Sequence, residues 1–215
     1  MSEAILYDKD IREPLFDFLE EKFGKVRIFE EKRTGRARAD VVMVTTTNLY
    51  GIEIKSDADT YTRLARQVKE YNSFYDKNYI VAGSSHAMHV SEHVPEWWGI
   101  ITVELDEKGE ADFYTLREAA LNPEVDAKNK IAFLWRPELN NLLEKNGLPK
   151  YREKSKSFVQ DKLLSTVPDE LLWPQAYEEL FERDYTTIVQ KINDYRQSIG
   201  QKKRRKRSFK RKRKS

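Results

Sequence analysis

The chain has 215 residues, of which 39% are hydrophobic and 12% aromatic, so it is long enough and apolar enough to bury a core. It contains no cysteine, which excludes a disulfide framework and a thiolate metal site. It has neither an apolar run of membrane-spanning length nor the layout of a signal peptide, and we therefore expect a soluble, cytoplasmic protein.

Charge is distributed unevenly along the chain. Residues 202–214 contain 11 Lys or Arg and no acid; removing those 11 from the 39 basic residues leaves 28 against 36 acidic residues, a net charge of −8. We expect this tail to be disordered when free and to attract nucleic-acid phosphates, with Phe209 able to stack on a base. Its basic residues are Lys202, Lys203, Arg204, Arg205, Lys206, Arg207, Lys210, Arg211, Lys212, Arg213 and Lys214. A nuclear-import signal and a plain solubility tail are the alternatives.

The first third of the chain predicts a helix and then three strands. Residues 8–21 place apolar side chains at helical spacing, with Asp8 as a candidate N-cap, and Phe23-Gly24 ends this pattern. Apolar residues alternate or run together in three strand-like stretches. These are residues 25–30, 41–44 and 50–55.

A helix over residues 60–75 and a strand over 78–83 follow. A helix between two strands implies a crossover connection, and so a mixed sheet in the order α-β-β-β-α-β. Further along we predict short elements at 88–92, 99–105 and 113–116, and then helices over 131–144, 155–164 and 173–199. We divide the chain into an α/β core (1–120), a helical subdomain (121–200) and the basic tail (201–215).

Three charged residues lie where the central strands begin or end. Asp40 precedes the apolar run at 41–44, and Glu53 and Lys55 are two apart in the next strand, so their side chains share a face. A hairpin would bring Asp40 and Glu53 side by side, where two carboxylates need a cation such as Mg²⁺ between them. Ordinary pairing of surface charges is the simpler reading of these residues alone.

Asp40, then Glu53-Ile54-Lys55, then Gln67 and Tyr71 on a helix form a pattern that resembles the PD-(D/E)XK nuclease superfamily, in particular its helicase-linked exonuclease branch. The stretch from 36 to about 103 is more closely similar to a family of small bacterial and phage members of that superfamily. The segments that carry this closer likeness are Gly51-Ile-Glu-Ile-Lys-Ser-Asp57 and Pro95-Glu-Trp-Trp-Gly99-Ile. The sequence departs from the superfamily at Ala39, where the usual motif has proline before the first aspartate.

The resemblance implies a restriction-endonuclease-like core and a metal-dependent deoxyribonuclease that hydrolyses phosphodiester bonds in DNA processing, repair or phage–host conflict. Asp40 and Glu53, with the Ile54 carbonyl, would hold Mg²⁺ or Mn²⁺. Lys55 would assist the attacking water. Gln67 would orient the scissile phosphate, the lysine or the water. Tyr71, counted with the nucleic-acid-binding residues, would support it.

Many superfamily members add a glutamate from the first helix. Here the helical register brings Arg12 to about that place, with Asp10 and Glu13 beside it, and Glu13 is the predicted substitute ligand. If no acid reaches the metal from this helix, a second metal ion is not expected. The alternative for Glu13 is an ordinary first-turn acid favoured by the helix dipole.

Basic residues near the predicted site suit the phosphates of DNA, because guanidinium groups match phosphate oxygens. They are Arg36, Arg38, Arg63 and Arg66. The three histidines, His86, His89 and His93, have a spacing that could bind zinc on a helix, but the neighbouring Trp97-Trp98 favours a packed aromatic segment.

Two further functions remain open from the sequence. One is a nuclease-like module that binds nucleic acid without cutting it, and the other is a phage accessory protein that recruits or inhibits a DNA-processing protein. Two adjacent carboxylates would repel a phosphate without a metal, which favours the nuclease. DNA is the expected partner, RNA is an alternative, and the oligomeric state is left open.

Overall fold

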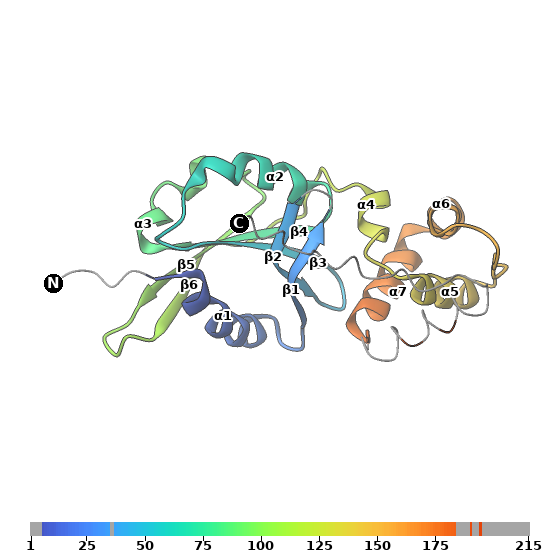
Figure 1. Cartoon of the computed structure of the whole chain (residues 1–215), viewed down its shortest axis with the longest axis horizontal. Coiled ribbons are helices and arrows are strands. Elements are labelled where there is room, and N and C mark those ends of the chain that lie inside the picture. Colours follow the sequence, from blue (N-terminus) through green and yellow to red (C-terminus); the bar gives the residue numbers. More distant parts are fainter. Residues whose placement is uncertain (1–5, 35–36, 184–189, 191–193, 195–215) are drawn as a thin grey trace, which may run out of the picture. The chain divides into compact units, whose positions relative to one another are not determined.

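The structure is a computed structural model that describes residues 6–34, 37–183, 190 and 194; side chains of residues 31–38 lie outside this description. In the part of the chain that it describes up to residue 183, a six-stranded sheet is flanked by helices and followed by four more (Figure 1). The elements are α1 (Asp8–Phe23), β1 (Arg27–Thr34), β2 (Ala37–Val44), β3 (Leu49–Lys55), η1 (Tyr61–Arg63), α2 (Leu64–Asn72), β4 (Lys77–Gly83), α3 (Ser84–Ala87), η2 (Val90–Glu92), β5 (Gly99–Leu105), β6 (Ala111–Arg117), α4 (Ala127–Ile131), α5 (Arg136–Lys145), α6 (Lys156–Thr166) and α7 (Asp169–Phe181).

The strands lie in the sheet in chain order, β1-β2-β3-β4-β5-β6. β1, β2 and β3 are antiparallel, β4 is parallel to both β3 and β5, and β6 returns antiparallel to β5. The parallel pair β3–β4 arises because α2 carries the chain back to the starting end of β3. The predicted mixed α/β sheet is therefore confirmed.

Alternate side chains of the central strands enter two separate cores, as the strand period of two requires. On one face, Val41 and Met43 of β2 pack with Leu15 and Leu19 of α1. On the other face, Val42 of β2 belongs to a core that includes residues of α2 and of α4–α7. Every residue of β3 is buried, which explains its almost continuous apolar sequence.

The first helix ends where the sequence predicts, but its N-cap is a different residue from the predicted one. α1 stops at Gly24, whose φ of 74° is a conformation that glycine adopts without steric cost. At the start, Tyr7 and not Asp8 is the N-cap, and the Tyr7 N–H donates to Asp10 Oδ2 at 3.2 Å. The predicted N-cap role of Asp8 is therefore wrong.

The helix predicted over 131–144 is interrupted in the structure. Residues 127–131 form α4, and α5 begins only at Arg136, with Pro137 in its first turn. Proline favours the first turn of a helix because it lacks the N–H that an interior position must donate. The Trp135 N–H donates instead to Glu138 Oε2 at 2.6 Å.

Three polar side chains from distant parts of the chain connect these helices to the sheet. Asp76, just before β4, accepts hydrogen bonds from Lys130 Nζ of α4 and from the Tyr177 hydroxyl of α7, each at 2.7 Å. Its Oδ2 also accepts from the Leu49 N–H at 2.8 Å. We call Asp76, Lys130 and Tyr177 the Asp76 cluster. The cluster joins α4 and α7 to the start of β3.

The chain forms two compact units, Met1–Glu182 and Arg183–Ser215. The first unit contains the sheet and all the helices α1–α7. Most of the second unit, including the basic tail and much of the helix predicted over 173–199, lies outside the described residues. Among the described residues, no helix is long and apolar enough to cross a membrane.

Candidate active site

The pairing of β2 with β3 stops next to Asp40. The last pair on this side is Val41 with Ile52, and beyond it the Ile54 N–H donates to the Asp40 carboxylate, Oδ2, at 3.0 Å. The Asp40 side chain thus accepts a hydrogen bond from a backbone N–H of β3 that has no backbone partner on β2 once the pairing of the two strands has stopped. In an extended strand the N–H and C=O of one residue point the same way, so the Ile54 carbonyl faces this side of β3 too.

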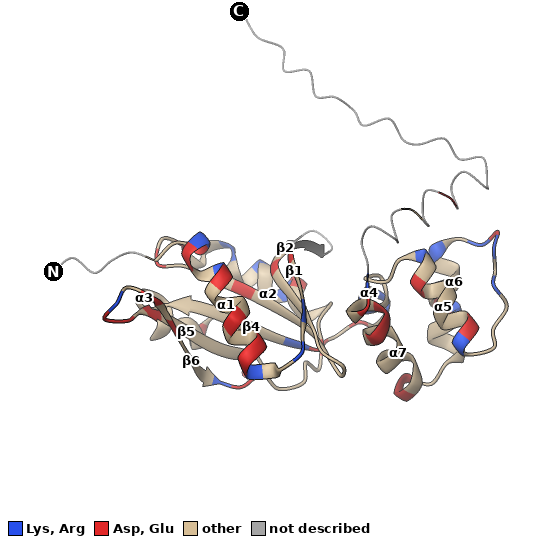
Figure 2. Ribbon diagram, turned by 90° about the horizontal axis from the view of Figure 1, so that it is seen from below, with Lys and Arg blue, Asp and Glu red and all other residues tan. Residues whose placement is uncertain are grey.

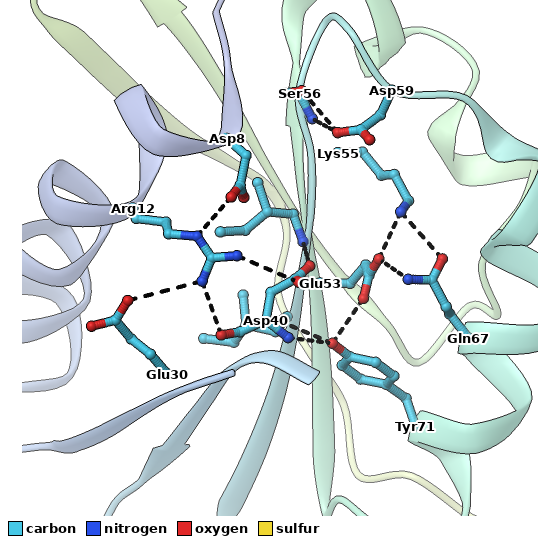
Figure 3. Close-up of polar contacts among 12 residues, drawn as sticks. Asp8, Arg12, Glu30, Asp40, Glu53, Lys55, Ser56, Asp59, Gln67 and Tyr71 are labelled. Atoms are coloured by element: carbon cyan, nitrogen blue, oxygen red, sulfur yellow. Dashed lines mark hydrogen bonds and ion pairs between the residues drawn. The ribbon is translucent and has the colours of Figure 1, made fainter. Parts of the chain in front are cut away.

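Glu53 lies at the centre of a hydrogen-bonded cluster that draws on two elements (Figure 3). Its Oε1 accepts from Lys55 Nζ at 2.6 Å and from the Gln67 amide, and its Oε2 accepts from the Tyr71 hydroxyl at 2.8 Å. Lys55 Nζ also donates to Gln67 Oε1 at 3.2 Å. Glu53 and Lys55 are 1% and 3% exposed. The structure therefore brings these four predicted residues together.

Tyr71 connects the helix with both strands. Its hydroxyl accepts from the Asp40 N–H at 3.2 Å and is the donor to Glu53. The ring is buried against β3 at Gly51, where a Cβ would lie 2.7 Å from Tyr71 and 2.3 Å from Tyr75. Only glycine allows this approach, and so Gly51 determines how near Tyr71 and Gln67, one turn apart on α2, come to the carboxylates.

Arg12 of α1 contacts the other carboxylate from the opposite side (Figure 3). Its guanidinium lies 3.6 Å from Asp40 Oδ1 and donates to the Asp40 carbonyl at 3.2 Å. Asp8 and Glu30 also contact this guanidinium, at 2.7 and 4.0 Å. Sequence reasoning missed Asp8 and Glu30 as neighbours of the site. For Asp8 a signal was present, because Asp and Arg four apart on a helix pair readily.

Glu13, the predicted extra ligand, is exposed, and Arg12 is the α1 residue that contacts Asp40. One residue along a helix turns the side chain by about 100°, so Arg12 and Glu13 point to different faces. Within the described ranges, no set of three His, Cys, Asp or Glu side chains is arranged to hold a metal. The candidate donors are therefore Asp40, Glu53 and the Ile54 carbonyl.

Burial raises the pKa of both carboxyl groups. For Glu53, desolvation and the nearby charge of Asp40 raise the pKa to about 7, against the opposing effect of Lys55. For Asp40, desolvation raises the pKa, while the Ile54 N–H and the Arg12 charge lower it. Burial and the charge of Glu53 raise the pKa of Tyr71, which keeps its phenol neutral and able to donate.

The remaining predicted nucleic-acid ligands fall into two groups. Arg63 ends η1 and Arg66 lies on α2, and both side chains are exposed. The side chains of Arg36 and Arg38, and the whole basic tail, lie outside the described residues. Their contacts with DNA stay predictions.

Two of the three histidines pack with a tyrosine ring, and the third, His89, is exposed. The Tyr61 ring lies 4.7 Å from His86 and 4.1 Å from His93, and His89 Nδ1 lies 3.1 Å from Glu92. These contacts agree with the packed aromatic segment expected from the sequence.

Comparison with known proteins gives one family and one distant structure. The family model described as "Bacteriophage P4 protein cII" matches residues 1–210. No curated protein matches the chain. A solved structure of SfsA from Pyrococcus furiosus, in complex with Ca²⁺, is 14% identical, covers 58% of this chain and 68% of its own, and has a TM-score of 0.36. At that TM-score the likeness carries no weight for fold or function.

Proposed function

The chain belongs to the bacteriophage P4 protein cII family, and we propose that it is a metal-dependent deoxyribonuclease with a PD-(D/E)XK-type site. One observation carries the proposal. Asp40 and Glu53 lie directly beyond the last β2–β3 pair, near enough for the charge of Asp40 to raise the pKa of Glu53, and Lys55, Gln67 and Tyr71 surround Glu53. A buried glutamate and a partly buried aspartate beside a lysine suit hydrolysis of a phosphodiester at a divalent cation.

The charges and donor atoms at the site fit Mg²⁺ or Mn²⁺. The four carboxylates of Asp8, Glu30, Asp40 and Glu53 face two cations, Arg12 and Lys55, which leaves a charge of −2 when all are ionised. The candidate donor atoms are carboxylate and carbonyl oxygens, which hard divalent cations prefer. Asp40, Glu53 and the Ile54 carbonyl would hold one such ion.

When bound, the metal would supply Lewis-acid stabilisation of the phosphate and a more acidic water. The chain's own residues would do the rest. Lys55, already within 2.6 Å of Glu53, would place its ammonium beside the attacking water and the charge that develops on the phosphate. Gln67 would orient Lys55 through their 3.2 Å hydrogen bond, and Tyr71 would hold Glu53 in position.

Basic residues would hold the DNA backbone at this site. Arg63 and Arg66 are exposed on the segment that also presents Gln67, so a strand that reaches Gln67 would pass near them. Arg36, Arg38 and the tail's 11 basic residues would add sequence-independent attraction to phosphates. This attraction would offset the repulsion between DNA and the acidic remainder of the chain.

The test is a cleavage assay on labelled linear, circular, single-stranded and branched DNA with Mg²⁺, Mn²⁺ or chelator. We expect metal-dependent products from the wild type and a loss of at least about 10³-fold, or roughly 4 kcal/mol in the barrier, in Glu53→Gln and in Lys55→Ala. The pattern of substrates cut would identify the class of DNA that the site accepts.

Two substitutions away from the site serve as matched controls. Glu104→Gln on β5 and Lys108→Ala in the turn after it change exposed side chains of the same types and should cut like the wild type. Cleavage retained in Glu53→Gln would disprove the proposed site. DNA binding without products on any substrate would instead support a nuclease-like protein that recognises nucleic acid without cutting it.

A further inference from the structure

The loop between α5 and α6 concentrates positive charge. Over residues 150–158 the sequence reads Lys-Tyr-Arg-Glu-Lys-Ser-Lys-Ser-Phe, with a basic residue at every second position from 150 to 156. All four basic side chains are exposed, and Figure 2 shows blue stretches, with one red residue among them, along this loop beside α6. They are Lys150, Arg152, Lys154 and Lys156.

This loop contrasts with the remainder of the chain. Before residue 202 the chain has 28 basic and 36 acidic residues; without the four basic residues and Glu153 of this loop it has 24 and 35, a net charge of −11. A polyanion that approaches the protein would thus be repelled by most of its surface and attracted by the loop. The loop is therefore positively charged, whereas the remainder of the chain before residue 202 has a net negative charge.

One arginine donates hydrogen bonds to two backbone carbonyls of the loop. Arg136, at the start of α5, donates from its two terminal nitrogens to the carbonyls of Tyr151 and Lys154, each at 2.7 Å. The Lys154 N–H also donates to the Tyr151 carbonyl at 3.0 Å. A loop that is already ordered loses little conformational entropy when it binds, so its charges can act together.

The start of α6 is capped by Ser155, whose hydroxyl accepts from the Phe158 N–H at 3.1 Å, but its first turn carries a cation. Lys156 is the first residue of α6, and the first turn contains no acid, whereas α1 and α7 begin with acids. A cation at the positive end of a helix dipole is destabilising, and an anion bound there would reverse the sign of this effect. The Lys156 ammonium also donates to the Ala132 carbonyl at 3.0 Å.

An aromatic side chain lies within the same charged surface. Phe158 is 38% exposed, and its ring lies 5.3 Å from Tyr151 and 5.4 Å from the Lys154 ammonium. An exposed ring among cations is the combination that binds unpaired bases and their phosphates. The salt bridge from Lys150 to Glu144 is exposed on both sides, at 3.4 Å, so a phosphate can replace it at little cost.

We propose that residues 150–158 form a contact surface for single-stranded nucleic acid, with Lys150, Arg152 and Lys154 on phosphates and Phe158 against a base. Unpaired bases are the ones that can stack on the ring, which is why a single strand is the expected ligand. This inference rests on the proposed function in one respect, because it takes nucleic acid as the partner. It does not depend on whether the protein cuts that nucleic acid. Its test therefore measures binding alone.

The experiment compares two full-length variants with the same change of charge. In the loop variant Lys150, Arg152 and Lys154 become Gln; in the control Lys9, Lys108 and Lys128, exposed elsewhere, become Gln. Binding of fluorescein-labelled oligo(dT) is measured by anisotropy across a salt series in chelator. Loss of three phosphate contacts should reduce the slope of log K against log salt by about 2 in the loop variant, and by much less in the control.

Stacking is tested separately with Phe158→Leu, which keeps the side chain apolar but removes the ring. An oligonucleotide containing 2-aminopurine should be quenched by the wild type and less by this variant. Equal slopes for the loop variant and control, or unchanged quenching with Phe158→Leu, would overturn the corresponding part of the proposal. Because chelator prevents metal-dependent cleavage, these results are independent of whether Glu53→Gln abolishes cutting.

Discussion

Two buried clusters in this chain are built from the same three kinds of side chain. In each, a carboxylate accepts hydrogen bonds from a lysine ammonium and a tyrosine hydroxyl: Asp76 from Lys130 and Tyr177, and Glu53 from Lys55 and Tyr71. Both carboxylates are buried, at 7% and 1% exposure. Composition and burial alone do not distinguish the two clusters.

The difference lies in a second carboxylate. Asp76 is matched one to one by Lys130, whose ammonium also lies 3.5 Å from the centre of the Trp173 ring. Glu53 instead has Asp40 beside it, and the charge of Asp40 raises the pKa of Glu53. A matched pair stabilises the fold where it stands, whereas the four carboxylates around Asp40 and Glu53 outnumber Arg12 and Lys55 by two and favour a further cation. We infer a structural role for the Asp76 cluster and a catalytic one for Glu53.

The largest effect is expected from breaking the matched pair. Asp76→Asn leaves the Lys130 ammonium buried without its carboxylate and weakens the link between α4, α7 and the sheet. We expect a loss of about 3 kcal/mol or more in the free energy of unfolding, measured by urea denaturation. Asp161→Asn, which removes the exposed partner of Lys128, is the control and should change this energy by less than about 1 kcal/mol. Equal effects would contradict the structural role.

At the candidate site, removing the charge of Glu53 should raise the free energy of unfolding instead of lowering it. The pKa of Glu53 is raised from its ordinary value near 4.5 to about 7, so between these values the folded state holds a proton that the unfolded state has released. The free energy of unfolding therefore falls as pH rises through this range, and the ionised carboxylate costs stability above pH 7. Glu53→Gln removes this cost.

We thus expect Glu53→Gln to be more stable than the wild type by about 1–3 kcal/mol at pH 8 in chelator. The gain should shrink as the pH falls toward 4.5, which urea denaturation across a pH series would measure. The exposed Glu104→Gln is the control and should change stability little at any of these pH values. A variant less stable than the wild type at pH 8 would place Glu53 with Asp76 as a structural carboxylate.

The smallest effect concerns the metal. If Asp40 and Glu53 hold Mg²⁺ or Mn²⁺, a metal concentration ten times the dissociation constant should stabilise the folded wild type by about 1.4 kcal/mol. Asp40→Asn should lose this gain in stability. Asp76→Asn removes a carboxylate outside the candidate site and should keep the gain. Thermal unfolding with and without metal measures both. A gain that survives in Asp40→Asn would locate the metal at another site.

Much of the candidate site follows from short-range pattern. Glu53 and Lys55 share a face because a strand alternates, and Gln67 and Tyr71 share one because a helix turns every 3.6 residues. The antiparallel register then places Asp40 beside Glu53, as expected for a hairpin. By contrast, whether Arg12 or Glu13 faces the carboxylates depends on how α1 docks against the sheet, and neighbouring residues of a helix differ by about 100°.

The sequence by itself determined the order of helices and strands, the mixed sheet and the approach of Asp40 to Glu53 and Lys55, because hydrophobic period and hairpin pairing are local properties. Gln67 and Tyr71 were expected beside them only from the resemblance to the nuclease superfamily. Only the tertiary structure decided that Arg12, which the helical register brings near the site, contacts Asp40 while Glu13 is exposed, and that Asp76, Lys130 and Tyr177 meet at all. These contacts join residues far apart in the chain, and no local period encodes them. They depend on how whole elements pack, which is decided by the burial of both cores together.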